Sequence, residues 1–267
     1  MKKIICSLTV LYVMFALLTS AQAAGFLSTA NGKELGLKYG KTIARQFTKP
    51  PKIDGNLDDW TGAVWIAFDT EKELLRGQKT WGGKDDISMT WSVAYDNDNF
   101  YFAMAVRDDI FSPGAKVSEA WQGDCIFLYI DWENKKKGTP DCKPNLSFIN
   151  KEAKVTNFGK NPEVSKSKIA IEPNADLGKG GRIYEVAIPF KYITAVKVTK
   201  GLEVGMPPGY EEGFNHDKEK GVFLDWGGIN PDDSSKLGQM KFGGPIVPSS
   251  VESKNKLTTF WGVVKGQ

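Results

Sequence analysis

Apolar and polar residues alternate along much of the chain, and this period of two is typical of half-buried β-strands. Every second residue from Ile87 to Tyr95 is large and apolar, and a second alternating run covers residues 100–106. Between them stand the turn residues Asp96 to Asn99. Two alternating runs around a four-residue turn predict an antiparallel hairpin.

Four further segments predict strands, namely residues 124–131, 182–190, 221–226 and 237–243. The first is apolar on both faces, so we expect it at the centre of the core. Helical periodicity is weak, and residues 71–79 form the best short candidate. The pattern predicts an all-β fold, a two-sheet antiparallel β-sandwich of jelly-roll-like type with few short helices.

The first residues have the composition of an export signal. Lys2 and Lys3 precede an apolar run from Ile4 to Leu18, and Ala21-Gln22-Ala23 is a small-x-small cleavage pattern. No later segment is apolar for long enough to span a membrane. We therefore expect a secreted or periplasmic protein with no integral membrane segment after processing. The expected organisation is a signal peptide (1–23), a lead-in segment (24–42), the sandwich (43–243) and a tail (244–267) that could add one strand.

Charge and rare residues exclude several functions. The formal charge is +3, and loss of the two signal-peptide lysines leaves 3 − 2 = +1, which gives no case for nucleic-acid binding. His216 is the single histidine, so multi-histidine zinc sites are excluded. Cys125 and Cys142 remain after processing. An exported protein allows a disulfide between them, and buried free thiols are an equal alternative.

Acidic residues occur as neighbouring pairs, Asp58 with Asp59, Asp108 with Asp109, and Asp232 with Asp233. Adjacent residues of a strand point to opposite faces, so such a pair cannot flank one glycosidic bond. Glycosidase activity is therefore disfavoured. The Asp96–Asn99 turn lacks the spacing of an EF-hand, and a plain turn is the better interpretation.

Tryptophan is the most conspicuous residue type, with eight copies. Trp91 lies in a strand pattern and should be in the core. Trp60 and Trp65 flank an early turn and are expected to plug one end of the sandwich. Trp121 stands at a loop-strand junction. Its indole could stack on a sugar ring or could close the edge of the core.

The order of several motifs resembles the family 9 carbohydrate-binding modules over residues 43–243. These motifs are PKIDGNLDDW, WSVAYDNDNFYFAMAVRDD, WQGDCIFLYID, YEVAIPF, FNHDKEKG and SSKLGQMKF. The resemblance implies a non-catalytic two-sheet sandwich that binds a sugar between tryptophan faces and carries structural calcium. It also implies that Asp54 and Asp58 fix a turn and that Trp60 packs.

The resemblance assigns candidate site residues one by one. Trp121 matches the first aromatic wall and Asn150 matches a polar contact, whereas Trp226 could form a second wall only if its loop is rearranged. Phe127 and Phe148 stand where such modules carry a glutamate and an arginine. For calcium, the resemblance points to the ends of two strands, where Asp108 and Asp131 are the candidates.

Three functions remain open. The first is a secreted, non-catalytic protein that binds a poly- or oligosaccharide by aromatic stacking. The second is a structural cell-surface or matrix sandwich without a sugar pocket. The third is a haem-binding domain of the DOMON type, which needs axial ligands. Its candidates are Met89, Met104, Met206, Met240 and His216.

Overall fold

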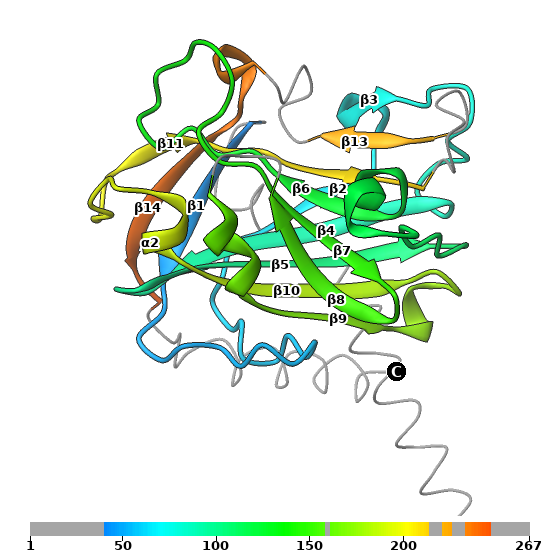
Figure 1. Cartoon of the computed structure of the whole chain (residues 1–267), viewed down its shortest axis with the longest axis horizontal. Helices are drawn as coiled ribbons and strands as arrows, with labels where there is room; N and C mark the ends of the chain where they lie inside the picture. The colour runs from blue at the N-terminus through cyan, green and yellow to red at the C-terminus, as the bar shows by residue number, and fades with distance from the viewer. Residues whose placement is uncertain (1–39, 158–160, 214–220, 226–232, 247–267) are drawn as a thin grey trace, which may run out of the picture.

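Two β-sheets pack face to face and form the body of the protein (Figure 1). The structure, a computed structural model, describes residues 40–157, 161–213, 221–225 and 233–246. Among these residues, no helix has the length and apolar character needed to cross a membrane. The predicted β-sandwich is confirmed, while the predicted signal peptide and most of the tail lie outside the described residues.

The larger sheet has eight strands in the order β11-β14-β1-β4-β5-β10-β9, with β2 paired to β4. Their bounds are β1 Lys41–Gln46, β2 Trp65–Phe68, β4 Ile87–Tyr95, β5 Asn99–Asp108, β9 Lys168–Pro173, β10 Arg182–Pro189, β11 Glu203–Gly205 and β14 Gln239–Pro245.

The smaller sheet has six strands in the order β3-β13-β12-β6-β7-β8. Their bounds are β3 Leu74–Arg76, β6 Cys125–Leu128, β7 Pro144–Ile149, β8 Glu152–Asn157, β12 Pro208–Glu211 and β13 Phe223–Asp225. The described helices are one α-helical turn and five 3₁₀ turns, α2 Phe190–Ile193, η1 Glu71–Glu73, η2 Val117–Gln122, η3 Pro162–Lys166, η4 Ala175–Leu177 and η5 Ser234–Lys236.

The predicted hairpin is formed by β4 and β5, which pair in register from Ile87 opposite Asp108 to Tyr95 opposite Phe100. Asp96 closes its turn, because one carboxylate oxygen accepts the N–H groups of Asp98 and Asn99 at 2.8 and 2.7 Å. The expectation of an antiparallel sandwich holds for most pairs. However, β1 pairs in parallel with both β14 and β4.

Two expected elements differ from the structure. The expected helix over residues 71–79 is wrong, since only η1 forms there and β3 follows directly. Thr70 and Glu73 close a capping box around η1, after which Leu74 and Arg76 pair with β13. The strand expected over residues 124–131 is also shorter than predicted. Its ladder ends at Leu128, and later residues make only isolated bridges.

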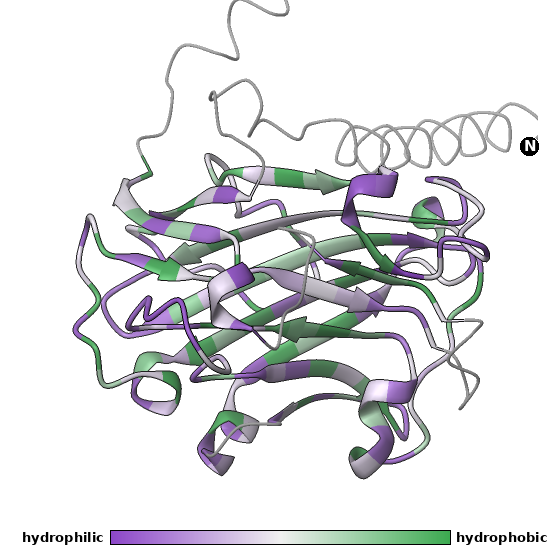
Figure 2. Ribbon diagram, turned by 90° about the horizontal axis from the view of Figure 1, so that it is seen from above, coloured by the Kyte–Doolittle hydropathy of each residue, from purple (hydrophilic) through white to green (hydrophobic). Residues whose placement is uncertain are grey.

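The inner faces of the two sheets form the main core. Trp91 is fully buried there and stacks on Phe102 with ring centroids 6.2 Å apart, which confirms the prediction for Trp91. Figure 2 shows hydrophobic and hydrophilic residues interspersed along the strands of both sheets. Cys125 and Cys142 are both buried and free, so the thiol alternative is the correct one. Burial raises the pKa of Cys142 to about 12.

The opening segment, residues 47–65, covers the outer face of the larger sheet. Trp60 and Trp65 pack there in a second apolar cluster with Phe47 and Tyr101, and the ring centroids of Trp60 and Trp65 are 5.9 Å apart. The expectation that the two tryptophans plug one end of the sandwich is therefore wrong. The sheet is apolar on both faces at its centre, and its outer face needs this cover.

Glu185 of β10 fastens the opening segment to the sheet. Its carboxylate accepts the N–H groups of Asp54 and Gly55, each at 3.0 Å, and the indole N–H of Trp60 at 2.8 Å. Asp54 in turn accepts the N–H of Asn56 at 3.1 Å. The Asp54 turn and the packing of Trp60 thus agree with what the resemblance implies, and these residues have a structural role.

We expect Glu185→Gln to destabilise the fold in a pH-dependent way. Burial raises the pKa of Glu185 above its usual 4.5. The stability linked to this raised pKa is fully present below about pH 4.5 and is lost as pH rises through the folded-state value. The penalty of Glu185→Gln, on the order of 1–3 kcal/mol, should therefore shrink from low to neutral pH.

Urea unfolding at several pH values would measure this penalty. Glu203→Gln, on the exposed side of β11, is the matched control and should stay within about 0.5 kcal/mol of the parent. A penalty for Glu185→Gln that is small or that grows with pH would contradict the proposed anchor.

Candidate functional site

One end of the sandwich gathers several loops, and we call it the η2 end. It consists of residues 108–124, residues 178–182 and the turn between β7 and β8. The backbones of residues 108–124 and 178–182 approach each other closely, and η2 packs against β7. A Cβ on Gly123 would lie 2.2 Å from the amide nitrogen of Gly114, and a Cβ on Gly180 would lie 2.6 Å from the carbonyl carbon of Ile110. Only glycine fits at these contacts.

Trp121 and Asn150 belong to this end. Trp121 lies in η2 and is partly exposed, whereas Asn150 is exposed in the β7–β8 turn with a φ of 53°. Cys125 of β6 is opposite Ser147 of β7. The 3₁₀ helix η2 packs against β7, and Asn150 directly follows Ile149, the last residue of β7. The structure therefore brings two of the three predicted sugar contacts to the same end, and Trp226 lies outside the described residues.

Three further side chains lie at this end, namely Phe148, which the sequence analysis named only as a departure from the family, and Phe111 and Arg182, which it missed. The rings of Phe111 and Phe148 meet at 5.8 Å between centroids, and the guanidinium carbon of Arg182 lies 3.9 Å from the Phe111 centroid. Arg182 also donates to the carbonyl oxygens of Gly180 and Gly181. These residues come from three separate segments, and no local pattern marks them.

Buried acids form the other part of the η2 end. Asp108 accepts the N–H of Ile110 at 2.8 Å and the Tyr210 hydroxyl at 3.1 Å, and burial raises its pKa to about 6. Asp124 accepts two backbone N–H groups, and burial followed by the charge of Asp108 raises its pKa. Burial, together with nearby acids, raises the pKa of Glu212 to about 7.

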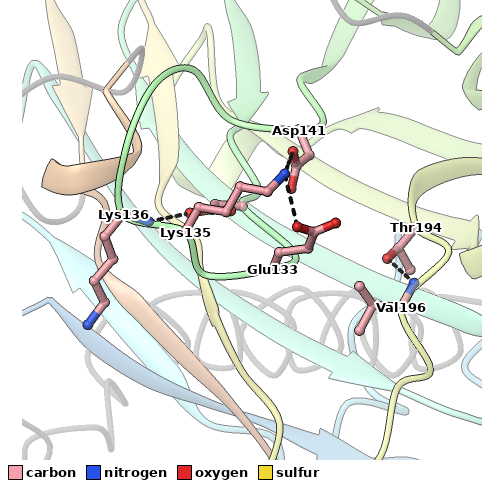
Figure 3. A network of polar contacts seen from close by, with 7 residues as sticks. Glu133, Lys135, Lys136, Asp141, Thr194 and Val196 are labelled. Atoms are coloured by element: carbon pink, nitrogen blue, oxygen red, sulfur yellow. Dashed lines mark hydrogen bonds and ion pairs between the residues drawn. The ribbon is translucent and has the colours of Figure 1, made fainter.

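Asp131, the second calcium candidate, lies at the opposite end of β6. Its backbone pairs with Gly205, and its carboxylate accepts the N–H of Lys136 at 3.1 Å. In the same loop Lys135 lies between Glu133 and Asp141, at 3.1 Å from each (Figure 3). Seven residues separate Asp131 from Asp124, which is roughly 20 Å along extended chain.

Asp108 and Asp131 therefore cannot be ligands of one ion. Among the described residues, no three His, Cys, Asp or Glu side chains are placed to hold a metal ion together. Calcium binding stays a prediction, and the acids that the structure places near Asp108 include Asp124, Asp86 and Glu212.

The four candidate haem-ligating methionines are buried in the apolar core. Met89, Met104, Met206 and Met240 are each at most 1% exposed. All four pack in the cluster between the sheets, and His216 lies outside the described residues. These placements give the haem alternative no support.

Solved structures share this fold. A family 9 carbohydrate-binding module from Caldicellulosiruptor kristjanssonii, solved with cellotriose, has a TM-score of 0.57 at 15% identity, covering 79% of this chain and 98% of the module. The module solved with glucose also has a TM-score of 0.57, at 16% identity, covering 76% and 96%. A putative carbohydrate-binding protein from Bacteroides uniformis has a TM-score of 0.51 at 12% identity, covering 77% of this chain and 100% of its own.

Among curated proteins no match was found. The sequence of residues 53–244 matches the family described as carbohydrate family 9 binding domain-like. This match runs from within the opening segment to Gly244 of β14, and it includes the smaller sheet, the larger sheet apart from β1, and the η2 end. The chain therefore belongs to the carbohydrate family 9 binding domain-like family.

Proposed function

We propose that this protein is an exported, non-catalytic binding protein for a poly- or oligosaccharide, and that the sugar binds at the η2 end. The observation that carries the proposal is the partly exposed Trp121 at a rigid end of a family 9 sandwich. Related structures hold glucose and cellotriose, which supports a saccharide ligand.

The chemistry of the η2 end suits a sugar. The face of an indole packs on the C–H face of a pyranose, while its N–H serves as a polar handle. Asn150 offers donors and an acceptor on the exposed turn, and Arg182 supplies a fixed guanidinium beside Phe111. A sandwich that holds these groups at the junctions of strands and loops limits the entropy lost on binding.

The proposed contacts predict weak binding. The described residues place one tryptophan, Trp121, at the η2 end, and the polar contacts lie at its exposed rim. We expect a dissociation constant on the order of 0.1–1 mM, which corresponds to about 4–5.5 kcal/mol. Such affinity suits a protein that holds a polymer through many repeated sites.

Trp121→Ala should abolish binding and leave folding nearly intact, because Trp121 is only partly buried. Trp91→Ala should instead unfold the domain or destabilise it by about 3–5 kcal/mol, because Trp91 is fully buried in the core. A glycan array that includes cello-oligosaccharides would identify a ligand, and calorimetry with circular dichroism would compare the variants. If Trp121→Ala binds as well as the parent, the proposed site is wrong. That result would favour the alternative of a structural protein without a sugar pocket.

We further propose that any calcium ion bound at the η2 end uses Asp108 and Asp124. Their fit is partial, because backbone N–H groups and Tyr210 already occupy part of both carboxylates. Calcium takes about six to eight oxygen ligands, so carbonyl oxygens or water would have to complete the site. The ion would stabilise the fold by offsetting the charges of buried acids.

Millimolar calcium should raise the melting temperature relative to chelator, and more so at about pH 8 than at about pH 5.5. Asp108 has a pKa of about 6, so it is ionised at the higher pH and able to bind a cation. Asp108→Asn should remove the effect, while Asp131→Asn, at the far end of β6, should keep it. An equal melting temperature with calcium and with chelator would contradict the proposal.

Export is the third part of the proposed function. The observation that supports export is the pattern before Ala24, in which two lysines, an apolar run and the sequence Ala-Gln-Ala follow one another. We expect the mature protein to begin at or near Ala24 in the periplasmic or extracellular fraction. N-terminal sequencing of the purified protein that found Met1 retained would overturn this expectation.

A further inference from the structure

A groove runs along the open side of the sandwich, where neither sheet continues. The smaller sheet ends at β8 and the larger one at β9, these two edge strands contact each other, and η3 packs against β8. The groove has a volume of about 650 Å³, which is within the usual range for ligand pockets. Val117 and Ser118 of η2 form one part of its wall, so the groove begins on the same short helix that carries Trp121.

The lining of the groove favours a neutral, hydroxyl-rich ligand. Its apolar part is aliphatic, from Val117, Val155 and Ile169 among others. Its polar part consists of hydroxyl and amide groups with one amine, and the described residues that line it include no carboxylate. Lys154 is the one charged residue among the described residues that line the groove. Its ammonium group already pairs with Glu152 at 2.6 Å. The groove therefore lacks the ion pairs that would select a charged ligand.

The hydroxyl groups are arranged to receive hydrogen bonds. Thr156 donates its hydroxyl hydrogen to Asn145 at 3.3 Å, and Ser165 donates its own to the carbonyl of Pro162 at 2.7 Å. Both oxygens keep acceptor lone pairs, and the Lys154 ammonium keeps donors beyond its bond to Glu152. Sugar hydroxyls both donate and accept, so a saccharide along this edge could pair with Ser165, and with Thr156 and Lys154 on the face of β8 opposite Val155.

We propose that this groove, which we call the β8 groove, holds the sugar units that follow the one stacked on Trp121. This inference rests on the proposed function, since it extends the same ligand from the η2 end along β8. Val117 and Trp121 are four residues apart in η2, which is kinked between them at Glu119, so both side chains belong to one short segment. The protein would then prefer longer chains to a single sugar, and the β8 groove would supply that preference.

The test compares glucose, cellotriose and cellopentaose by calorimetry on the full chain. In the parent, cellopentaose should bind about tenfold more tightly than glucose, which two or three net hydrogen bonds can supply. Ser165→Leu narrows the groove, and Thr156→Val removes one acceptor without a change in shape. Each variant should bind cellopentaose little more tightly than glucose, and it should keep the parent's affinity for glucose. Retained glucose binding would also show that the variant is folded.

Ser235→Leu is the matched control, because Ser235 is likewise an exposed serine inside a 3₁₀ turn and lies outside the groove. It should keep the full gain with chain length. Equal affinity of the parent for glucose and cellopentaose would overturn the β8 groove and leave the proposed function standing. A gain that survives in both groove variants would overturn it as well. Absence of binding to all three sugars would overturn both proposals for cello-oligosaccharides.

Discussion

The central hairpin of the larger sheet has to be covered on both of its faces, and the rest of the structure follows from that constraint. All nine residues of β4 are buried, and β5 is buried over most of its length. The inner face is covered by the smaller sheet. The outer face is covered by the opening segment, which Glu185 fastens through three N–H groups. Apolar area on two faces thus explains both layers and the long non-strand lead into β2.

The η2 end depends on this scaffold in a different way. Its loops carry exposed or half-exposed side chains, and loops on rigid strands are the usual place for binding residues. Gly114 and Gly123 let residues 108–124 fold back on themselves, and Gly180 lets residues 178–182 approach them to backbone contact. That contact fixes the position of η2 and therefore of Trp121. Trp121, the proposed sugar contact, is only partly buried there, so its replacement should leave the core intact.

Buried carboxyl groups serve the two regions in contrasting ways. Glu185 has three N–H partners and joins the opening segment to the sheet. Asp108, Asp124 and Glu212 lie near one another, and each repels the others when ionised. Their raised pKa values show that ionisation at the η2 end costs free energy. Burial also raises the pKa of Glu185, so its three N–H partners offset only part of the cost of burying that charge.

The sequence alone determined the β-sandwich, the β4–β5 hairpin and the burial of Trp91, because alternation with a period of two reports local exposure directly. It also placed Trp121 at a loop-strand junction. Its signal for β7 and β8 was too weak to predict them, since polar residues such as Asn145 and Ser147 are buried there. The same limit produced the helix expected over residues 71–79, where pairing with β13 decides the structure.

Only the tertiary structure decided which distant residues meet. Arg182 reaches Phe111 from a strand that begins 71 positions later in the sequence, since 182 − 111 = 71. Glu185 meets Asp54 across 131 positions, and Asp131 proves to lie far from Asp108 because β6 carries the chain to the other end. The β8 groove exists because two sheets end side by side. Such contacts depend on strand order and register, which alternation within a segment does not specify.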